Sequence, residues 1–537
     1  MAEENSAAVL TPTPSEPKLN RVERIKKGKD PFEVWEAIER YAVTGFDSIE
    51  KDDIDLFKWY GIYTQSSDTT GYFMLRIKLP NGDLTSTQLR TIASITQRFA
   101  QGLADVTDRQ NFQLHWIQIE NIPTIGRELE AVGLSLKGSS GDTVRNVIGC
   151  PLSGYDPTEI IDTWPLVEEV NRRLAGNSEF GNLPRKFKIS ISGCVEQCAH
   201  PEINDLGLVA VRKANGEVGF EAWVGGGLGS QPHLGQRLGV FIPPSAAVEV
   251  ASHIIAIFRD HGYRKNRAHA RLKFLLADWG VAKFREELEQ RLGYHLEDGP
   301  AGYQAPANAY RDHVGAYLQK DGRYALGLAT LGSRVTADQL FALADLAERY
   351  GSSHLRNTTL QNIVLLDIAA ESLEEVKAAT AALGLPSETS SFRRGLMSCT
   401  GNQFCKQAVS ETKIRAVNLV EALELELPNF SRSAGRQLSI AFNGCPNSCT
   451  RYQVADIGLV GSLGRPTNNP SGEKEEVFQI YLGGKLGQDA QLGHHLKQRI
   501  RATEIKDYIV NLLQRFEAER EEGESFTQYV NRNLGEG

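Results

Sequence analysis

The sequence predicts an α+β fold in which one arrangement of elements occurs twice. Polar and apolar residues alternate where strands are expected, and apolar residues recur at every third or fourth place where helices are expected. The first copy runs strand, helix, strand, helix over residues 71–80, 86–103, 111–120 and 122–133. The second copy has the same order over residues 323–331, 336–351, 357–368 and 372–384. This repetition predicts pseudo-twofold symmetry.

Single residues repeat at nearly the same offset as these elements. Cys194 and Cys198 lie 251 residues before Cys445 and Cys449 (445 − 194). Further pairs at similar offsets are Cys150 with Cys399, Arg145 with Arg394, Arg109 with Arg356, and Arg76 with Leu328. A self-similar pattern of this length indicates a duplication. We therefore expect both halves of the chain to share one fold.

Length and composition are typical of a soluble protein with more than one core. The chain has 537 residues and a net charge of -8, and no apolar run approaches the length of a membrane span. Residues 1–20 are rich in Pro, Ser and Thr and lack the features of a signal or transit peptide, which predicts a disordered lead-in. Basic residues crowd residues 21–29 before Pro31 opens a helix, as in a solvated arm or a surface for an acidic redox partner. We expect a cytoplasmic monomer that binds neither membranes nor nucleic acid.

Four cysteines near the C-terminal end are spaced as ligands of one iron–sulfur cluster. Cys399 and Cys405 have five residues between them, and Cys445 and Cys449 have three. Four thiolates suit one [4Fe–4S] cubane. Zinc also takes four thiolates but favours two to four residues within each pair, so the longer gap fits it poorly. Buried structural thiols are the remaining alternative.

The two halves differ where chemistry is expected. Asp156 stands at the position that answers to Cys405, so the first half has three of the four thiols and is not expected to hold a second cluster. In return, the first half carries cations that the second lacks. Lys186 and Lys188 answer to Gln437 and Ser439, as Arg76 answers to Leu328.

The two lysines are predicted to share one face of a strand. Side chains alternate between the faces of a strand, so Lys186 and Lys188 point away from Phe187 and Ile189. Two like charges on one face repel each other unless an anion lies between them. Two solvated lysines on an exposed strand are the alternative interpretation.

The cysteine motifs also carry a resemblance to a known family. The stretches CTGNQFC and NGCPNSC, followed by ADIGLVG, resemble the ferredoxin-dependent assimilatory nitrite reductases, within the larger family of sirohaem-containing nitrite and sulfite reductases. The resemblance runs from about Phe46 to about Leu534. It implies that the four cysteines hold one [4Fe–4S] cluster and that Cys449 also bridges to the iron of sirohaem.

The resemblance further implies which side chains hold the substrate and the sirohaem. The anion would be bound on the distal face of the cofactor by Arg76, Arg145, Lys186 and Lys188. The implied cofactor-contacting residues are Arg109, Asn111 and Gln361, although Arg109 could also be an ordinary surface arginine. Cationic donors are suited to holding a small oxyanion and to stabilising charge on its departing oxygens.

The same resemblance implies an internally duplicated three-domain sirohaem reductase fold. Two ferredoxin-like halves are expected over residues 45–135 and 310–390, and two related α/β cofactor-binding lobes over residues 140–290 and 393–530. Residues 1–44 would be the lead-in and first helix. The glycine-rich run at 225–229 lacks the acidic residue of a dinucleotide fingerprint, and no flavin or nicotinamide domain is evident. Electrons are therefore expected from a separate carrier, reduced ferredoxin.

The implied reaction is the six-electron reduction of nitrite to ammonia in nitrate and nitrite assimilation, with sulfite reduction to sulfide as the close alternative. The motif TGNQFC with the following ETK resembles nitrite reductases. Some sulfite-reducing relatives have a cysteine at the position of Thr143, able to react with a tyrosine near Tyr63, and it is absent here. Lys188 instead resembles sulfite reductases, because plant-type nitrite reductases usually have asparagine there. A further alternative is an iron–sulfur electron carrier without a substrate site.

Overall fold

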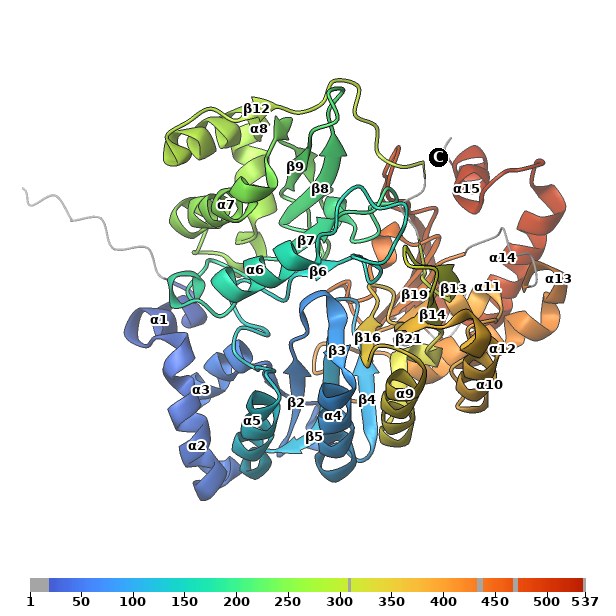
Figure 1. Cartoon of the computed structure of the whole chain (residues 1–537). Coiled ribbons are helices and arrows are strands. Elements are labelled where there is room, and N and C mark those ends of the chain that lie inside the picture. The colour runs from blue at the N-terminus through green and yellow to red at the C-terminus, as the bar shows by residue number, and fades with distance from the viewer. Residues whose placement is uncertain (1–18, 308–310, 432–437, 467–471, 535–537) are drawn as a thin grey trace, which may run out of the picture.

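The computed structural model describes residues 19–307, 311–431, 438–466 and 472–534. Within these residues the chain forms a central domain with two lobes packed against it (Figure 1). We use central domain for residues 62–131 and 315–382, first lobe for residues 140–298 and second lobe for residues 391–534. The lead-in that the sequence predicts to be disordered falls almost wholly in residues 1–18, outside the described residues. The α+β class and the duplicated arrangement are confirmed.

The central domain contains two antiparallel sheets that exchange one edge strand each. The first sheet has the order β1-β2-β5-β4-β15, over Ile62–Thr64, Tyr72–Ile77, Phe112–Gln118, Leu103–Val106 and Arg334–Thr336. The second has the order β13-β14-β17-β16-β3, over Gly315–Leu318, Tyr324–Leu328, Ile363–Ile368, His354–Asn357 and Asp83–Thr85. Strand β15 belongs to the second half and β3 to the first. Each half therefore completes the sheet of the other, which covers an otherwise open edge.

The helices of the two halves begin in the same way. Helices α4 (Ser86–Phe99) and α9 (Ala337–Tyr350) each start with a capping box, in which the side chains of a threonine and a glutamine satisfy each other's backbone amides. Each glutamine also donates from Nε2 to a carbonyl beyond the next helix, Gln88 to Val132 at 3.0 Å and Gln339 to Leu383 at 2.8 Å. These next helices are α5 (Ile122–Ala131) and α10 (Leu373–Ala382).

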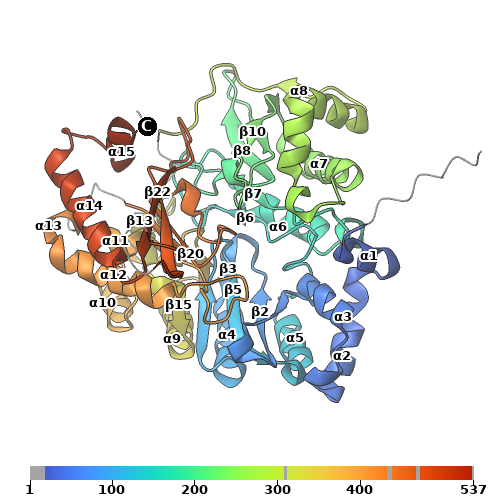
Figure 2. The ribbon, with the colours of Figure 1, turned by 180° about the vertical axis from the view of Figure 1, so that it is seen from behind.

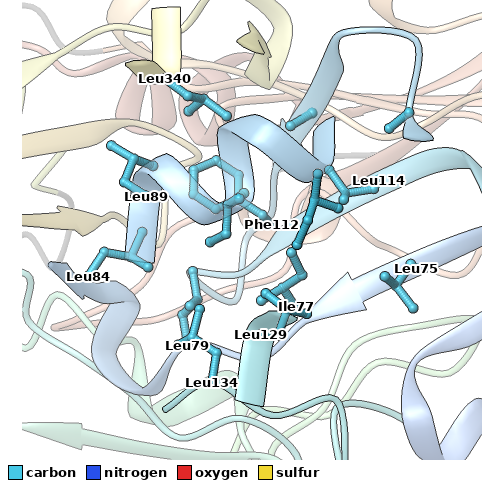
Figure 3. Packing of buried hydrophobic residues seen from close by; sticks show 14 of the residues in the cluster. Leu75, Ile77, Leu79, Leu84, Leu89, Phe112, Leu114, Leu129, Leu134 and Leu340 are labelled. Carbon is cyan, nitrogen blue, oxygen red and sulfur yellow. The ribbon is translucent and has the colours of Figure 1, made fainter. Parts of the chain in front are cut away.

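Apolar residues from both halves form one continuous core. Figure 3 shows Phe112 of β5 beside Leu89 of α4, with Leu340 of α9 above them in this view. All three belong to a single buried cluster that also includes Leu326 of β14. Because burial of apolar side chains is the main stabilising contribution to folding, the two halves are expected to fold as one unit.

The two lobes contain sheets with the same pattern of strand pairing. In the first lobe the order is β10-β9-β8-β7-β6, over Gln236–Arg237, Val218–Val224, Leu206–Arg212, Ile189–Ser192 and Ile148–Gly149. In the second lobe the order is β18-β19-β20-β21-β22, over Leu396–Ser398, Ile440–Asn443, Ile457–Gly464, Glu475–Leu482 and His494–Arg501. The first three strands of each lobe along the chain are parallel, and the next two are antiparallel.

Helices cover these sheets, as the view from behind also shows (Figure 2). Those of the first lobe are α6 (Trp164–Leu174), α7 (Ala247–His261) and α8 (Leu272–Leu292), and a short ribbon pairs β11 (Val240–Phe241) with β12 (Glu297–Asp298). Those of the second lobe are α11 (Ser391–Arg394), α12 (Lys413–Glu426), α13 (Pro428–Ser431), α14 (Ile505–Glu519) and α15 (Phe526–Leu534). None of the described helices is long and apolar enough to span a membrane.

The basic segment near the N-terminus is a folded part of the protein. It forms α1 (Arg21–Gly28), which is followed by α2 (Val34–Thr44) and α3 (Lys51–Leu56). The ammonium of Lys26 is buried and lies 3.4 Å from a carboxylate oxygen of Asp142. Lys29 forms an ion pair with Asp53 at 2.7 Å. The segment is therefore a helix held to the fold by Lys26 and Lys29 and not a free arm, although Arg24 and Lys27 are exposed to solvent.

The structure corrects two of the pairings between the halves. The amide of Thr107 donates to the carbonyl of Asn111 at 2.9 Å, and that of Thr358 donates to Asn362 at 2.8 Å, which fixes an offset of 251 here. Arg109 therefore answers to Leu360 and not to Arg356. By strand register Arg76 lies opposite Gln113 and Gly327 lies opposite Val364, so Arg76 answers to Gly327 and not to Leu328. The partner predicted from the sequence thus lies a few residues before the true one for Arg109 and directly after it for Arg76. Gln437, the counterpart predicted for Lys186, lies outside the described residues.

Candidate active site

Both cysteine motifs of the second lobe follow the ends of neighbouring parallel strands. Strand β18 ends directly before Cys399, and β19 ends two residues before Cys445. Ser398 lies opposite Phe442 in the parallel register, and the amide of Cys399 donates to the carbonyl of Phe442 at 3.0 Å. The carboxyl ends of parallel strands meet at one edge of a sheet, where ligands commonly bind. The two motifs are therefore brought together, as one four-cysteine site requires.

The surroundings of these sulfurs favour a positively charged cluster. The sulfur of Cys399 accepts hydrogen bonds from the amides of Gly401 at 3.3 Å and Gly444 at 3.2 Å, contacts of the kind that tune cluster potentials. Burial, together with the neighbouring cysteine sulfurs, raises the pKa of Cys399 and raises that of Cys445 to about 11. Thiols in this setting ionise only if a cation compensates their charge. The irons of a [4Fe–4S] cluster supply that charge, so the donor set fits the cluster.

Cys449 is the accessible member of the set. Its side chain is exposed, whereas Cys198 at the same position of the first lobe is fully buried. A cavity adjoins the Cys449 loop and is lined by Asp108, Arg109, Lys188, Asn204, Ser448 and Arg451 among others. The loop that carries this exposed thiol therefore borders a cavity, which fits a sulfur that also reaches a second cofactor.

Lys186 and Lys188 have the predicted orientation. Phe187 and Ile189 are buried in the core of the first lobe, while both lysines are only partly buried and so face the other way. Among the described residues, no carboxylate lies within ion-pair distance of either ammonium group. Burial, together with the nearby guanidinium groups, lowers the pKa of Lys188 to about 7, although the carboxylate of Asp108 acts in the opposite direction. Such a site gains from binding an anion.

Two arginines extend this basic region. The amide of Arg145 donates to the carbonyl of Phe187 at 2.8 Å, which places Arg145 beside the two lysines. Arg76 on β2 donates to the hydroxyl of Ser140 at 2.5 Å and lies over the ring of Tyr63. Burial alone would raise the pKa of Tyr63, but the charges of Arg145 and Arg76 lower it. The four residues predicted for the anion thus form one basic group on the first-lobe side.

The three residues predicted to contact sirohaem differ in their hydrogen-bond partners. Arg109 donates to the side chain of Asn204 at 2.8 Å and to the carbonyl of Asn146 at 2.6 Å, and its Nε has no partner among the described residues. Its environment is a buried cavity wall, not an exposed surface. Asn111 accepts from the amide of Leu79 at 3.0 Å, and Gln361 bonds the backbone of Ser398. Asn111 and Gln361 thus bond to backbone groups outside the cavity lining, and neither side chain lines the cavity itself.

Sequence reasoning missed three residues of this site. Arg451 and Asp108 line the cavity, and Arg451 follows Cys449 by two residues, so proximity to the motif was a usable signal. Arg271 forms a two-bond ion pair with Asp205, which in turn accepts the amide of Lys188 at 2.8 Å. Nothing local marks Arg271, because it is brought to the site only by the fold.

Comparison with known proteins places the chain in a family. The model described as nitrite and sulphite reductase 4Fe-4S domain matches residues 140–296 and 389–533, and the nitrite/sulfite reductase ferredoxin-like half domain matches residues 65–132 and 317–383. The sulfite reductase [ferredoxin] of Mycobacterium tuberculosis is 43% identical over 531 residues, covering 95% of this chain and 94% of that protein. The assimilatory ferredoxin-dependent nitrite reductase of Haloferax mediterranei is 37% identical over 528 residues, covering 93% and 89%.

A solved structure agrees with these matches. The structure of the Mycobacterium tuberculosis NirA protein superposes with a TM-score of 0.92 at 42% identity, covering 96% of this chain and 97% of that one. The ferredoxin-like halves and the two lobes predicted from the sequence are thereby confirmed. The chain belongs to the nitrite and sulfite reductases, a family of oxidoreductases that bind sirohaem and a [4Fe–4S] cluster.

Proposed function

We propose that the protein reduces nitrite to ammonia with six electrons from reduced ferredoxin, in nitrate and nitrite assimilation. The observation that carries this proposal is the basic group of the first lobe, whose Lys188 lines the same cavity as the loop of Cys449 in the second lobe. An anion held by this group would lie beside the cofactors. An electron carrier without a substrate would have no need of such a group.

The residues of the basic group have two tasks in this proposal. Arg76 and Arg145 hold the oxygens of the anion through their guanidinium groups. Lys186 and Lys188 lie where burial lowers their pKa, so they can pass protons to oxygens that leave as water. The four cysteines of the second lobe would hold the [4Fe–4S] cluster, and Cys449 would join it to sirohaem, which supplies the electrons and the iron that binds the anion when both cofactors are present.

Nitrite is supported by the residue at position 143. Tyr63 lies against Arg76 and Arg145, and Thr143 occupies the position where some sulfite-reducing relatives have a cysteine. The hydroxyl of Thr143 is buried. A threonine cannot form the covalent link to a tyrosine that a cysteine can. The motif TGNQFC with ETK supports nitrite as well.

Sulfite is the second candidate, and Lys188 is the observation that favours it. A fourth cation suits sulfite, which carries more negative charge than nitrite at neutral pH. The Mycobacterium tuberculosis relative named a sulfite reductase is also more similar to this chain than the Haloferax mediterranei relative named a nitrite reductase. Ferredoxin is supported as the donor by the names of both relatives, and we propose a cytoplasmic monomer.

A side-by-side turnover experiment tests the proposal. The holoenzyme is supplied with reduced ferredoxin and either nitrite or sulfite, and ammonia and sulfide are measured. We expect a higher kcat/KM for nitrite. A higher value for sulfite would select the second candidate, and turnover of neither by protein with full sirohaem content would contradict both.

A further inference from the structure

The three cysteines of the first lobe form a second, separate cluster with a histidine. The sulfurs of Cys194 and Cys198 lie 3.3 Å apart, and the sulfur of Cys150 lies 3.8 Å from Nε2 of His313. The ligand atoms of Cys150, Cys198 and His313 all lie within 4.8 Å of one another. All four side chains are buried, with at most 2% of their surface exposed. No role in the proposed function accounts for this group.

The first lobe brings the cysteines together just as the second lobe does. Strand β6 ends directly before Cys150, and β7 ends two residues before Cys194. The loops share key hydrogen bonds with those of the second lobe: the amide of Asp156 donates to Leu152 at 2.9 Å as the amide of Cys405 donates to Gly401 at 3.1 Å. Asp156 is thus the true counterpart of Cys405, as predicted. Its carboxylate turns to Arg311, at 2.5 Å, and not to the thiols.

His313 replaces the missing ligand from another part of the chain. It lies on the connection between the first lobe and β13, next to Asp312, whose carboxylate is paired with Arg394 at 2.9 Å. The backbone of His313 has a φ of 57°, in the left-handed region, and packs directly against Gly327 of β14. A Cβ at Gly327 would lie 1.5 Å from the carbonyl oxygen of His313. The backbone therefore fixes this imidazole in place beside the sulfurs.

The spacing distinguishes a single ion from a second cubane. Thiolates that share one zinc ion at about 2.3 Å in a tetrahedron lie about 3.7 Å apart. The two sulfurs of Cys194 and Cys198, 3.3 Å apart, are close to this value, and the sulfur of Cys150 lies at a similar distance, 3.8 Å, from the ring nitrogen of His313. Each thiolate of a cubane binds its own iron, so its sulfurs lie farther apart. Among the described residues, the cysteines of the second lobe form no such close group, as a cubane requires.

We propose that Cys150, Cys194, Cys198 and His313 bind one Zn²⁺ ion as a closed structural site. Three thiolates and one imidazole are a standard ligand set for structural zinc. Binding of Zn²⁺ releases the three thiol protons, so the ion and its three thiolates together carry a net charge of minus one. The guanidinium of Arg311, two residues before the histidine, lies beside this charge. Because the ligands come from the first lobe and from the connection to the second half of the central domain, the ion ties these two parts together.

Metal analysis of the purified holoenzyme tests this proposal. We expect about one zinc per chain besides the iron of sirohaem and about four cluster irons. Zinc K-edge X-ray absorption should give about three sulfur ligands and one nitrogen ligand, a readout that iron does not disturb. Adventitious surface zinc would instead show oxygen and nitrogen ligands, and that result would overturn the proposal.

Matched variants separate this site from the iron–sulfur cluster. Cys198→Ser and His313→Ala should lose zinc but keep the visible spectrum, whereas Cys449→Ser should lose iron but keep zinc. If the two first-lobe variants do not fold, the zinc content and X-ray absorption of the wild type still decide the question. Wild-type protein with full iron but no zinc after expression in zinc-supplemented medium would overturn the proposal. So would a Cys194–Cys198 disulfide found by mass spectrometry, or about eight cluster irons per chain.

Discussion

Nδ1 of His200 lies 2.7 Å from Nη1 of Arg451, and the two residues are 251 positions apart in the chain. They occupy the same place in the two lobes, each two residues after the last cysteine of its motif, and both have left-handed backbones, with φ of 54° and 59°. Equivalent residues of a duplicated fold touch only at the pseudo-twofold axis. The contact therefore marks where the two lobes meet.

Other contacts cross the interface in the same symmetric way. A carboxylate oxygen of Glu202 accepts the amide of Gly487 at 2.8 Å, and Gln453, its counterpart, donates to the carbonyl of Gly229 at 2.7 Å. Each lobe thus holds the glycine-rich loop of the other. The runs also need glycine within each lobe, because a Cβ at Gly226 would lie 2.4 Å from the carbonyl oxygen of Glu202, and one at Gly484 would lie 2.7 Å from that of Gln453.

Arg451 is predicted to hold the lobes on the central domain. Its Nη2 donates to the carbonyls of Asp108 at 2.7 Å and Thr359 at 2.6 Å. Arg451→Met should lower the free energy of unfolding by about 2 to 3 kcal/mol, because buried carbonyls lose charged donors. Urea unfolding measures the change. Arg349→Met is the control, since the Arg349 side chain is 73% exposed, and equal stability of both variants would contradict the assignment.

Cys449 and Cys198 are predicted to differ in function although they are equivalent in the fold. Cys449→Ser should reduce cluster and sirohaem content, because it removes an exposed thiol from the four proposed to hold the cluster. Cys198→Ser should leave both nearly unchanged, because its buried thiol is not one of these four. Iron, labile sulfide and the visible spectrum per chain give the comparison. Equal losses in both variants would show that Cys449 and Cys198 do not differ in function.

Lys188 is predicted to tune the choice between substrates. Sulfite carries more charge than nitrite, so this cation should favour sulfite by about 1.4 kcal/mol, and Lys188→Asn should lower sulfite turnover about tenfold. Nitrite turnover should change much less. Because burial lowers the pKa of Lys188 to about 7, the ammonium loses its proton as the pH rises through that value, and the difference between wild type and variant should shrink above it.

Steady-state rates for both substrates, at equal sirohaem and cluster content, check this prediction. Lys137→Asn, a change at a lysine outside the basic group, is the charge-matched control. A loss of nitrite turnover as steep as that of sulfite would make Lys188 a general catalytic residue instead of a specificity residue.

Asp142 is predicted to anchor the N-terminal helix, and its contribution to the free energy of unfolding should depend on pH. Its buried carboxylate is 2.7 Å from Arg267 and 3.4 Å from Lys26. Burial alone would raise the pKa of Asp142, but Lys26 and the arginines hold it well below its usual range. Asp142→Asn should cost about 3 to 5 kcal/mol at pH 7, because it leaves buried cations unpaired.

The pH dependence follows from the direction of this shift. A carboxyl whose pKa is lower in the folded than in the unfolded state stabilises the fold above the unfolded value of about 3.9 and loses that contribution as the pH falls. Urea unfolding from pH 7 to pH 3 should therefore show a difference between wild type and Asp142→Asn that is constant down to about pH 5 and then shrinks. A difference that stays constant to pH 3 would mean that charge is not the cause.

The sequence by itself determined the features that depend on neighbours along the chain. The periods of the strands and helices and the spacing of the cysteines are local patterns. The repeat can be found by comparing two stretches of one chain. The opposite faces of Lys188 and Ile189 followed from the alternation of side chains along a strand. Only the tertiary structure decided the exchange of β3 and β15, the contact of His200 with Arg451, and the approach of His313 to Cys150. Such contacts join residues more than a hundred positions apart, and they leave no periodic signal because each depends on how whole sheets and lobes pack together.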